Sequence, residues 1–291
     1  MKRIDTLKTN KWRYLSLLSG FFLLVGPFAF LSGAVLLSIG SQASADLHTF
    51  CFRMPLDWFF SGRFYMLIGS VAAGFILTVV VASFFAGPVF CGWMCPVGGV
   101  SEATSRAAPL PNKFRLKIRG TNVTTGLRYG FLFGFIVVAI IAAYKLVPQI
   151  GSVCCRYCAS SVLQNFASGI FGNPDALAYW HSGAIIVLAS WLLIGGVLFV
   201  GGRGWCLFFC PLGAVSNLAH KGGARLGLFK VKFNKDKCQN CSTCSVNCPM
   251  WAIKEDKQVD RSLCIACKEC THACPNGAYS YKRGKDNAQD N

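Results

Sequence analysis

Eight cysteines near the end of the 291-residue chain constrain its fold more than any other feature. They form two runs with the spacing C-x2-C-x2-C-x3-C-P, one from Cys238 to Pro249 and one from Cys264 to Pro275. In bacterial proteins, two runs with this spacing bind two [4Fe-4S] clusters through cysteine thiolates. The pattern therefore predicts a protein that carries electrons.

The ligand sets of the two clusters are expected to cross between the runs. Three cysteines at two-residue intervals wrap one cluster, while the fourth lies too far along the chain and binds the other. The predicted sets are Cys238, Cys241, Cys244 and Cys274 for one cluster, and Cys248, Cys264, Cys267 and Cys270 for the other. Residues 221–291 are thus expected to form an α+β ferredoxin-like domain. A pair of zinc knuckles is the competing interpretation, but zinc spacing does not require the proline after each fourth cysteine.

Residues 1–220 are expected to form an α-helical membrane domain. The chain is 53% apolar and contains 24 phenylalanines. A transmembrane helix needs about 20 consecutive apolar residues. Four windows qualify, at 14–39, 64–87, 129–147 and 183–200, and they predict a bundle of four transmembrane helices.

The formal net charge of +17 predicts the topology of these spans rather than nucleic-acid binding. Residues 1–13 and 88–126 each carry five Lys or Arg against one acidic residue, whereas 40–63 and 148–182 are neutral. Basic loops stay on the cytoplasmic side of a membrane and attract anionic lipid head groups. We therefore expect a multi-pass protein of a bacterial inner membrane, with its N-terminus and ferredoxin-like tail in the cytoplasm.

The segment Ala43-Ser44-Ala45 before Asp46 resembles a signal-peptidase site. The apolar stretch before it is longer than the roughly 7 to 15 residues typical of a signal peptide. An uncleaved membrane anchor is therefore expected. Cleavage between Ala45 and Asp46 would leave three spans and the same cytoplasmic tail.

Two further cysteine pairs repeat 115 residues apart. Cys91 and Cys95 follow the second window, and Cys206 and Cys210 follow the fourth, each pair in a C-x3-C-P-(V/L)-G motif. This repetition predicts a duplicated two-span unit that ends on a cytoplasmic cysteine pair. If the two units pack together, four thiols converge, enough for a third iron–sulfur cluster or a metal ion. Reduced thiols in a tight glycine-rich turn, or a redox-active thiol pair, are the alternatives.

The loops expected outside hold the last four cysteines, Cys51, Cys154, Cys155 and Cys158. On an oxidising face, disulfides are the default for such cysteines. The adjacent Cys154 and Cys155 are poor partners for each other, so Cys51 is predicted to be tied to the second loop. A cofactor or a thiol-redox role is the alternative for this set.

The ordered combination of four spans, two C-x3-C-P motifs and a tail with two four-cysteine motifs resembles the NapH/MauN family of ferredoxin-type polytopic membrane proteins. It resembles polyferredoxins such as NosR and CcoG more loosely. The likeness covers nearly the whole chain, except the group at 154–158. It implies cluster ligation by the eight tail cysteines, and makes Cys91, Cys95, Cys206 and Cys210 the family's paired membrane-surface cysteines. It also implies a quinol dehydrogenase component that takes electrons from the membrane quinone pool toward a periplasmic redox system, as in nitrate reduction or methylamine oxidation.

Two functions of different classes fit these observations. The first is a quinol dehydrogenase or electron conduit, and the lack of charged residues inside the windows disfavours an ion pump. About 30 Å of hydrocarbon separates the tail clusters from a periplasmic acceptor. Electrons need intermediate redox groups to cross this distance, and the other eight cysteines are the candidates to hold them. The second is a maturation factor that sends reducing equivalents outward to a periplasmic metalloenzyme or cofactor, with Cys155 and Cys158 as a working thiol pair.

Overall fold

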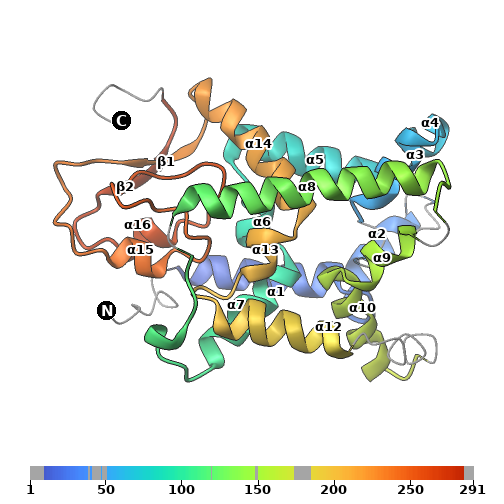
Figure 1. Cartoon of the computed structure of the whole chain (residues 1–291), viewed down its shortest axis with the longest axis horizontal. Coiled ribbons are helices and arrows are strands. Elements are labelled where there is room, and N and C mark those ends of the chain that lie inside the picture. The colour runs from blue at the N-terminus through green and yellow to red at the C-terminus, as the bar shows by residue number, and fades with distance from the viewer. Residues whose placement is uncertain are drawn as a thin grey trace.

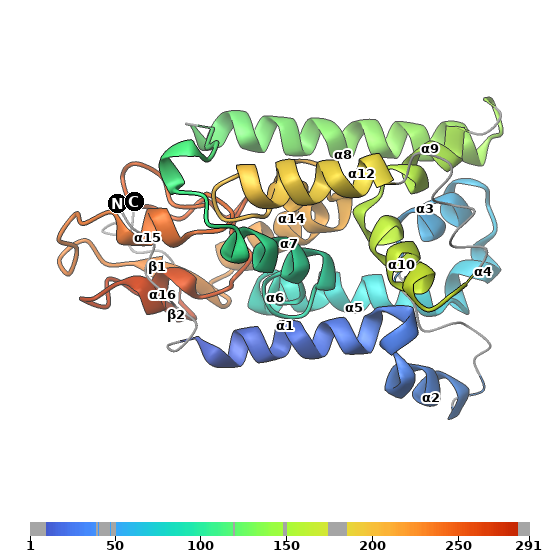
Figure 2. The same cartoon turned by 90° about the horizontal axis from the view of Figure 1, so that it is seen from below.

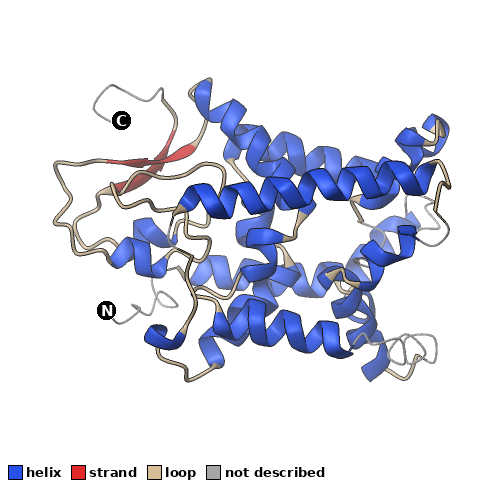
Figure 3. Ribbon diagram, viewed as in Figure 1, coloured by secondary structure: helices blue, strands red, loops and turns tan. Residues whose placement is uncertain are grey.

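Helices make up almost all of the described structure outside the C-terminal region (Figure 3). The computed structural model describes residues 10–38, 40, 47, 51–118, 120–147, 150–173 and 185–284. The first half contains α1 (Lys11–Leu24), η1 (Gly26–Phe28), α2 (Phe30–Ser38), α3 (Arg53–Phe60), α4 (Phe64–Ile68), α5 (Val71–Ala86), α6 (Val89–Trp93), α7 (Pro96–Ala107) and η2 (Asn112–Phe114). The second half contains α8 (Thr121–Ala143), α9 (Ile150–Arg156), α10 (Ala159–Ile170), α12 (Ile185–Ala189), the π-helical η4 (Ser190–Leu198), α13 (Gly204–Phe208) and α14 (Pro211–Arg225). The C-terminal region contains β1 (Lys230–Phe233), α15 (Thr243–Asn247), α16 (Glu269–Ala273) and β2 (Tyr279–Lys282).

The first predicted span, 14–39, is not one continuous helix. α1 ends at Leu24 and α2 begins at Phe30, with Pro27 in the 3-10 turn η1 between them. Proline has no backbone N–H and its ring clashes with the preceding turn, so a helix stops there. Residue 39 and the segment 41–46, which contains the candidate cleavage site, lie outside the described residues.

The second predicted span, 64–87, is interrupted as well. Ser70 starts α5 anew, because its Oγ accepts a hydrogen bond from the backbone N–H of Ala73 at 3.0 Å and so caps the helix. α5 ends at Ala86, and the next residue, Gly87, has a φ of +72°, which favours glycine. The chain then turns sharply, and the α6–α7 segment is bent by 93° relative to α5.

Within the described ranges, α8 is the one helix long and apolar enough to cross a membrane by itself. Its 23 residues rise about 34 Å at roughly 1.5 Å per residue, against about 30 Å of hydrocarbon. It begins before the predicted window 129–147 and ends at Ala143. In the fourth window, α12 and η4 form a shorter apolar helix, and residues 183 and 184 lie outside the described part. Helix length alone thus indicates one span, or two if the bent α5–α7 pair is counted.

The two halves of the helical region pack reciprocally. α7 packs against α1 of its own half and against η4 of the other half. α14 packs against α8 of its own half and against α5 of the other, beside which it lies in Figure 1. Figure 2 shows α7 between α1 and α12. Each half thus contributes a helix, α7 or α14, that packs against the other half. Such packing is expected for two copies of one unit when neither copy can bury its apolar faces alone.

The C-terminal region repeats its backbone as well as its cysteines. β1 and β2 pair antiparallel, with Lys230 opposite Lys282 and Phe233 opposite Tyr279. Three pairs of residues 26 positions apart share a left-handed backbone: Asn240 with Ala266, Ser242 with Lys268, and Trp251 with Gly277. Apolar helices followed by a small ferredoxin-like region with a sheet confirm the predicted class in outline.

The ferredoxin-like region is anchored directly to the helices. The hydroxyl of Tyr281 donates to the carbonyl of Ala86 at 2.6 Å, and the indole N–H of Trp251 donates to the carbonyl of Val200 at 2.8 Å. α14 runs across the predicted domain boundary between residues 220 and 221.

Candidate iron–sulfur sites

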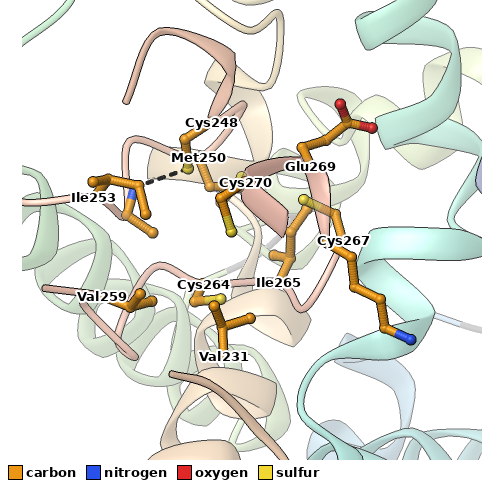
Figure 4. Close-up of a pocket in the computed structure, with 12 residues that line it drawn as sticks. Val231, Cys248, Met250, Ile253, Val259, Cys264, Ile265, Cys267, Glu269 and Cys270 are labelled. Carbon is orange, nitrogen blue, oxygen red and sulfur yellow. Dashed lines mark hydrogen bonds between the residues drawn. The ribbon is translucent and has the colours of Figure 1, made fainter. Parts of the chain in front are cut away.

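Four of the tail cysteines surround one pocket in the ferredoxin-like region (Figure 4). They are Cys248, Cys264, Cys267 and Cys270, the four that the spacing places in one ligand set. The rest of the wall is mainly apolar, including Met250, Ile253 and Ile265, together with Lys268 and Glu269. The structure thus brings together cysteines from both runs in one mainly apolar site.

Backbone N–H groups point at two of the tail sulfurs. Ala252 donates to Cys248 Sγ, and Ala278 donates to Cys274 Sγ, both at 3.3 Å. Such bonds stabilise thiolates and tune iron–sulfur clusters. Burial raises the pKa of Cys264 to about 12, so this thiol keeps its proton at neutral pH until a metal ion displaces it.

The other set, made of Cys238, Cys241, Cys244 and Cys274, is more open. Cys241 is exposed, whereas Cys244 is buried and its thiol donates to the hydroxyl of Tyr279 at 3.5 Å. The side chain of Asn276 donates to the carbonyl of Lys237 at 3.4 Å. This bond holds the segment after Cys274 beside the segment before Cys238.

In the part of the chain that the structure describes, which includes all 16 cysteines, no three His, Cys, Asp or Glu side chains gather as ligands of one metal ion.

The four C-x3-C-P cysteines meet near the centre of the molecule, at α6 and α13 (Figure 1). Cys91 lies in α6 and Cys206 in α13, while Cys95 and Cys210 directly precede α7 and α14. Cys210 is close enough to the other three for their charges to interact. Its Sγ also accepts a hydrogen bond from the backbone N–H of Gly213 at 3.3 Å.

Two buried arginines, Arg203 and Arg128, flank this set, at 0% and 1% exposure. The glycine of each C-P-(V/L)-G motif makes room for one of them. A Cβ on Gly98 would lie 2.5 Å from Nη1 of Arg203, and a Cβ on Gly213 would lie 2.8 Å from Nη2 of Arg128. Nη2 of Arg203 and Nε of Arg128 have no hydrogen-bond partner within the described protein. Because buried cations need a compensating charge, these residues fit an anionic, thiolate-bound cluster.

A buried group of charges joins the central cysteines to the ferredoxin-like region. We call it the Glu102 cluster; its members are Arg13, Glu102, Arg106, Arg203 and Glu269. Glu102 in α7 accepts hydrogen bonds from Arg13 at 2.6 Å and from Arg203 at 3.0 Å. Arg106 also contacts it, at 3.1 Å. Arg13 in α1 bonds Glu269 of α16 at 2.7 Å, so one network links four segments.

The same arginines hold the backbone around Cys91. Nη1 of Arg203 donates to the carbonyl of Cys91 at 2.6 Å, and Nε of Arg13 donates to the carbonyl of Gly92 at 2.9 Å. Trp93 of α6 donates from its indole to the carbonyl of Ala266, between two ligands of the tail pocket, at 3.1 Å. The central and tail sites are therefore fixed relative to each other.

Sequence reasoning missed the Glu102 cluster, since Arg13 and Glu102 were counted as charges of exposed loops. They are 0% and 2% exposed. The internal repeat could have pointed to it, because the two C-x3-C-P motifs lie 115 residues apart. At the same spacing, Arg13 corresponds to Arg128 and Glu102 corresponds to Asn217. Asn217 is buried too, and donates to the carbonyl of Cys264 at 2.7 Å.

The remaining four cysteines gather at the end of the molecule opposite the ferredoxin-like region (Figures 1 and 2). Cys154 and Cys155 lie in α9, Cys158 directly precedes α10, and Cys51 lies just before α3. The structure places no disulfide among these four residues, and the link from Cys51 to the second loop stays a prediction. Cys51 lies close enough to Cys155 and Cys158 for their thiol groups to interact electrostatically.

Two family models match the chain, both described as "4Fe-4S binding domain". One matches twice, over residues 67–119 and 184–235, and the other matches residues 257–280. Each match of the first model contains one C-x3-C-P motif, which supports the duplicated unit. No solved structure matches the chain.

Several curated proteins are similar over most of the chain. An uncharacterized protein of Methanocaldococcus jannaschii is 29% identical over 74% of the chain and 74% of its own length. The ferredoxin-type protein NapH of Haemophilus influenzae is 26% identical over 74% of the chain and 69% of its length. The methylamine utilization ferredoxin-type protein MauN of Paracoccus denitrificans is 30% identical over 63% of the chain and 54% of its length.

Cysteine spacing, pocket and matches together define the chain as a ferredoxin-type 4Fe-4S protein. Its relatives include the NapH and MauN proteins, which confirms the resemblance drawn from the motifs. The likeness to NapH and the apolar helices also indicate membrane association.

Replacing Cys241 by Ser should remove one tail cluster. Iron and acid-labile sulfide are expected to fall by about four atoms each per chain, because iron–sulfur clusters are held by thiolates. The measurement is metal and sulfide analysis of protein purified anaerobically in detergent. Gln239→Ala, at an exposed neighbour, should leave both values unchanged. Wild-type iron in Cys241→Ser would contradict the ligand assignment.

Gly98→Ala should destabilise the fold by about 1 to 3 kcal/mol, because the new methyl group overpacks the site against Arg203. Gly99→Ala is the matched control in the same helix, since its Cβ would meet Leu17 at an ordinary 3.6 Å. Thermal unfolding in detergent measures the difference. Equal unfolding temperatures for the two variants would show that the contact at Gly98 does not matter.

Glu102→Gln should cost about 3 to 5 kcal/mol, because it leaves buried arginines without their counter-charge. Glu255→Gln, at an exposed turn, should change stability by no more than about 0.5 kcal/mol. Both variants keep every cysteine, so thermal unfolding compares them directly. A Glu102→Gln protein as stable as the control would argue against a stabilising network.

Proposed function

We propose that the chain is a membrane-bound iron–sulfur protein that oxidises quinol and passes the electrons toward a redox system on the outer face of a bacterial inner membrane. The observation that carries this proposal is the placement of the 16 cysteines. They form groups at one end of the molecule, at its centre and at its opposite end (Figure 1). When bound, iron–sulfur clusters at these groups supply one-electron transfers.

The surface of the helices supports a membrane setting. Large apolar side chains stand exposed on α1, α5, α8 and η4, for example Phe22, Phe85, Phe133 and Leu193. A soluble protein rarely exposes so extended an apolar surface. We propose four spans formed by α1–α2, α4–α5, α8 and α12–η4. The ferredoxin-like region then lies in the cytoplasm and α3, α9 and α10 lie outside.

The chain's own residues have clear tasks in such a conduit. Arg203 and Arg128 provide fixed positive charge beside the central cysteines, which favours an added electron there. The hydrogen bond from Trp93 to Ala266 and the Glu102 cluster keep the central site against the tail site. Buried apolar side chains around the tail pocket exclude water.

Quinol oxidation balances with two one-electron acceptors. One quinol yields one quinone, two protons and two electrons, and each electron reduces one cluster. The membrane quinone pool is the proposed donor, and periplasmic or membrane-associated redox proteins are the proposed acceptors. The name of one relative, MauN, refers to methylamine utilization, which is consistent with such an acceptor system.

A maturation factor is the second candidate, and one contact favours it. Nη1 of Arg53 lies 3.2 Å from Sγ of Cys155, and a neighbouring cation makes a thiol more reactive by stabilising its thiolate. In this alternative, electrons from the cytoplasmic tail reach Cys155 and Cys158 and reduce a disulfide or a metal outside.

Anaerobic mixing with a quinol analogue tests the proposal. Purified protein in lipid nanodiscs should lose visible absorbance and gain the EPR signal of reduced clusters, while the corresponding quinone should leave the spectrum unchanged. A spectrum that responds to dithionite but not to quinol would contradict quinol oxidation. If a deletion strain then makes a periplasmic metalloenzyme in an inactive form, the maturation role is favoured.

A further inference from the structure

We infer that the four outer cysteines, Cys51, Cys154, Cys155 and Cys158, form a binding site for a further iron–sulfur cluster. They come from two segments far apart in sequence, before α3 and around the α9–α10 junction, which the fold brings together. The inference concerns metal binding alone. It does not depend on quinol being the electron donor.

The starts of two helices point at these sulfurs. Backbone N–H groups in the first turn of α3 lie near the sulfur of Cys51, and those in the first turn of α10 lie near the sulfur of Cys158. The two helices have 8 and 12 residues. A helix N-terminus carries partial positive charge and stabilises an anion, including a thiolate.

A side-chain cation completes the surroundings. Nη1 of Arg53 donates to Sγ of Cys155 at 3.2 Å, and the same guanidinium also interacts with Cys154. Each of the four sulfurs is thus next to either a helix N-terminus or a guanidinium. A disulfide is neutral and gains little from the positive potential of these helix N-termini and of the guanidinium. A cluster bound by four thiolates is anionic, and this positive potential stabilises it.

The local geometry matches that of the predicted tail ligands. Cys155 and Cys158 have the C-x2-C spacing found within both tail runs. Cys158 receives backbone N–H groups from the residues that follow it, as Cys248 does from Ala252 and Cys210 does from Gly213. Thiolate-only sites hold zinc or iron–sulfur clusters. The C-x2-C spacing shared with the tail runs favours a cluster over a zinc ion.

The site also lies where an external partner can reach it. All four cysteines are partly exposed rather than buried, and they stand at the end of the molecule farthest from the ferredoxin-like region (Figure 2). With this assignment each of the 16 cysteines belongs to one of four sets of four. The outer set is then the end of the molecule from which electrons leave or at which they enter.

Metal analysis of the full chain tests this inference. In anaerobically purified protein, Cys51→Ser and Cys158→Ser should each lose about four iron and about four sulfide atoms per chain. The double variant should lose no more than either single variant, because both residues hold the same cluster. Tyr157→Phe, between two of the thiols, should keep wild-type iron. Retention of the EPR signals of the tail clusters shows that the variants are folded.

A second variant keeps all four ligands. Arg53→Gln should retain iron but shift one reduction potential to a lower value, because loss of a nearby cation disfavours an added electron. Wild-type iron in both serine variants would overturn the inference. So would a disulfide among the four cysteines in protein alkylated anaerobically, or the loss of one zinc ion in place of iron.

Discussion

The ion pairs that Glu102 makes with Arg13 and Arg203 are the interaction on which the arrangement of the protein depends. Burying arginine and glutamate side chains is costly unless they lie against opposite charges. Arg13 reaches both Glu102 and Glu269, and Arg203 reaches Glu102, only when α1, α7, α16 and the segment before α13 are all in place. Pairing of these charges therefore selects one geometry, in which the central cysteines lie against the tail site.

The duplicated units differ at the position where this cluster forms. The first unit has Glu102 and the second has Asn217, while both have a buried arginine, Arg13 in α1 and Arg128 in α8. Glu102 neutralises charge in the first unit. Asn217 only bonds backbone carbonyls, so Arg128 keeps its full charge beside the central cysteines. This asymmetry gives the central site a net positive surrounding, which suits an anionic cluster and raises its affinity for an electron.

Much of this site could be predicted because ligand chemistry imposes spacing on the sequence. The gathering of Cys248 with the three cysteines of the second run, and the meeting of Cys91 with Cys206, follow from repeats in the sequence. The role of Arg13 could not be predicted in the same way, because an arginine beside an apolar stretch is usually a topology signal. Pro27 is a sequence signal for a helix break. The long apolar window 14–39 nevertheless predicts one continuous span, because its length and hydrophobicity alone fit a membrane helix. The placement of Cys51 beside 154–158 depends on packing between α3, α8 and α9, which no local pattern specifies.

Iron and acid-labile sulfide per chain, measured with Mössbauer spectroscopy on anaerobically purified protein, test the central claim most directly. Four sets of four cysteines predict about 16 iron atoms per chain, all in thiolate-bound clusters. About eight iron atoms, with the tail clusters intact, would contradict the account, because the central and outer cysteines would then hold no cluster.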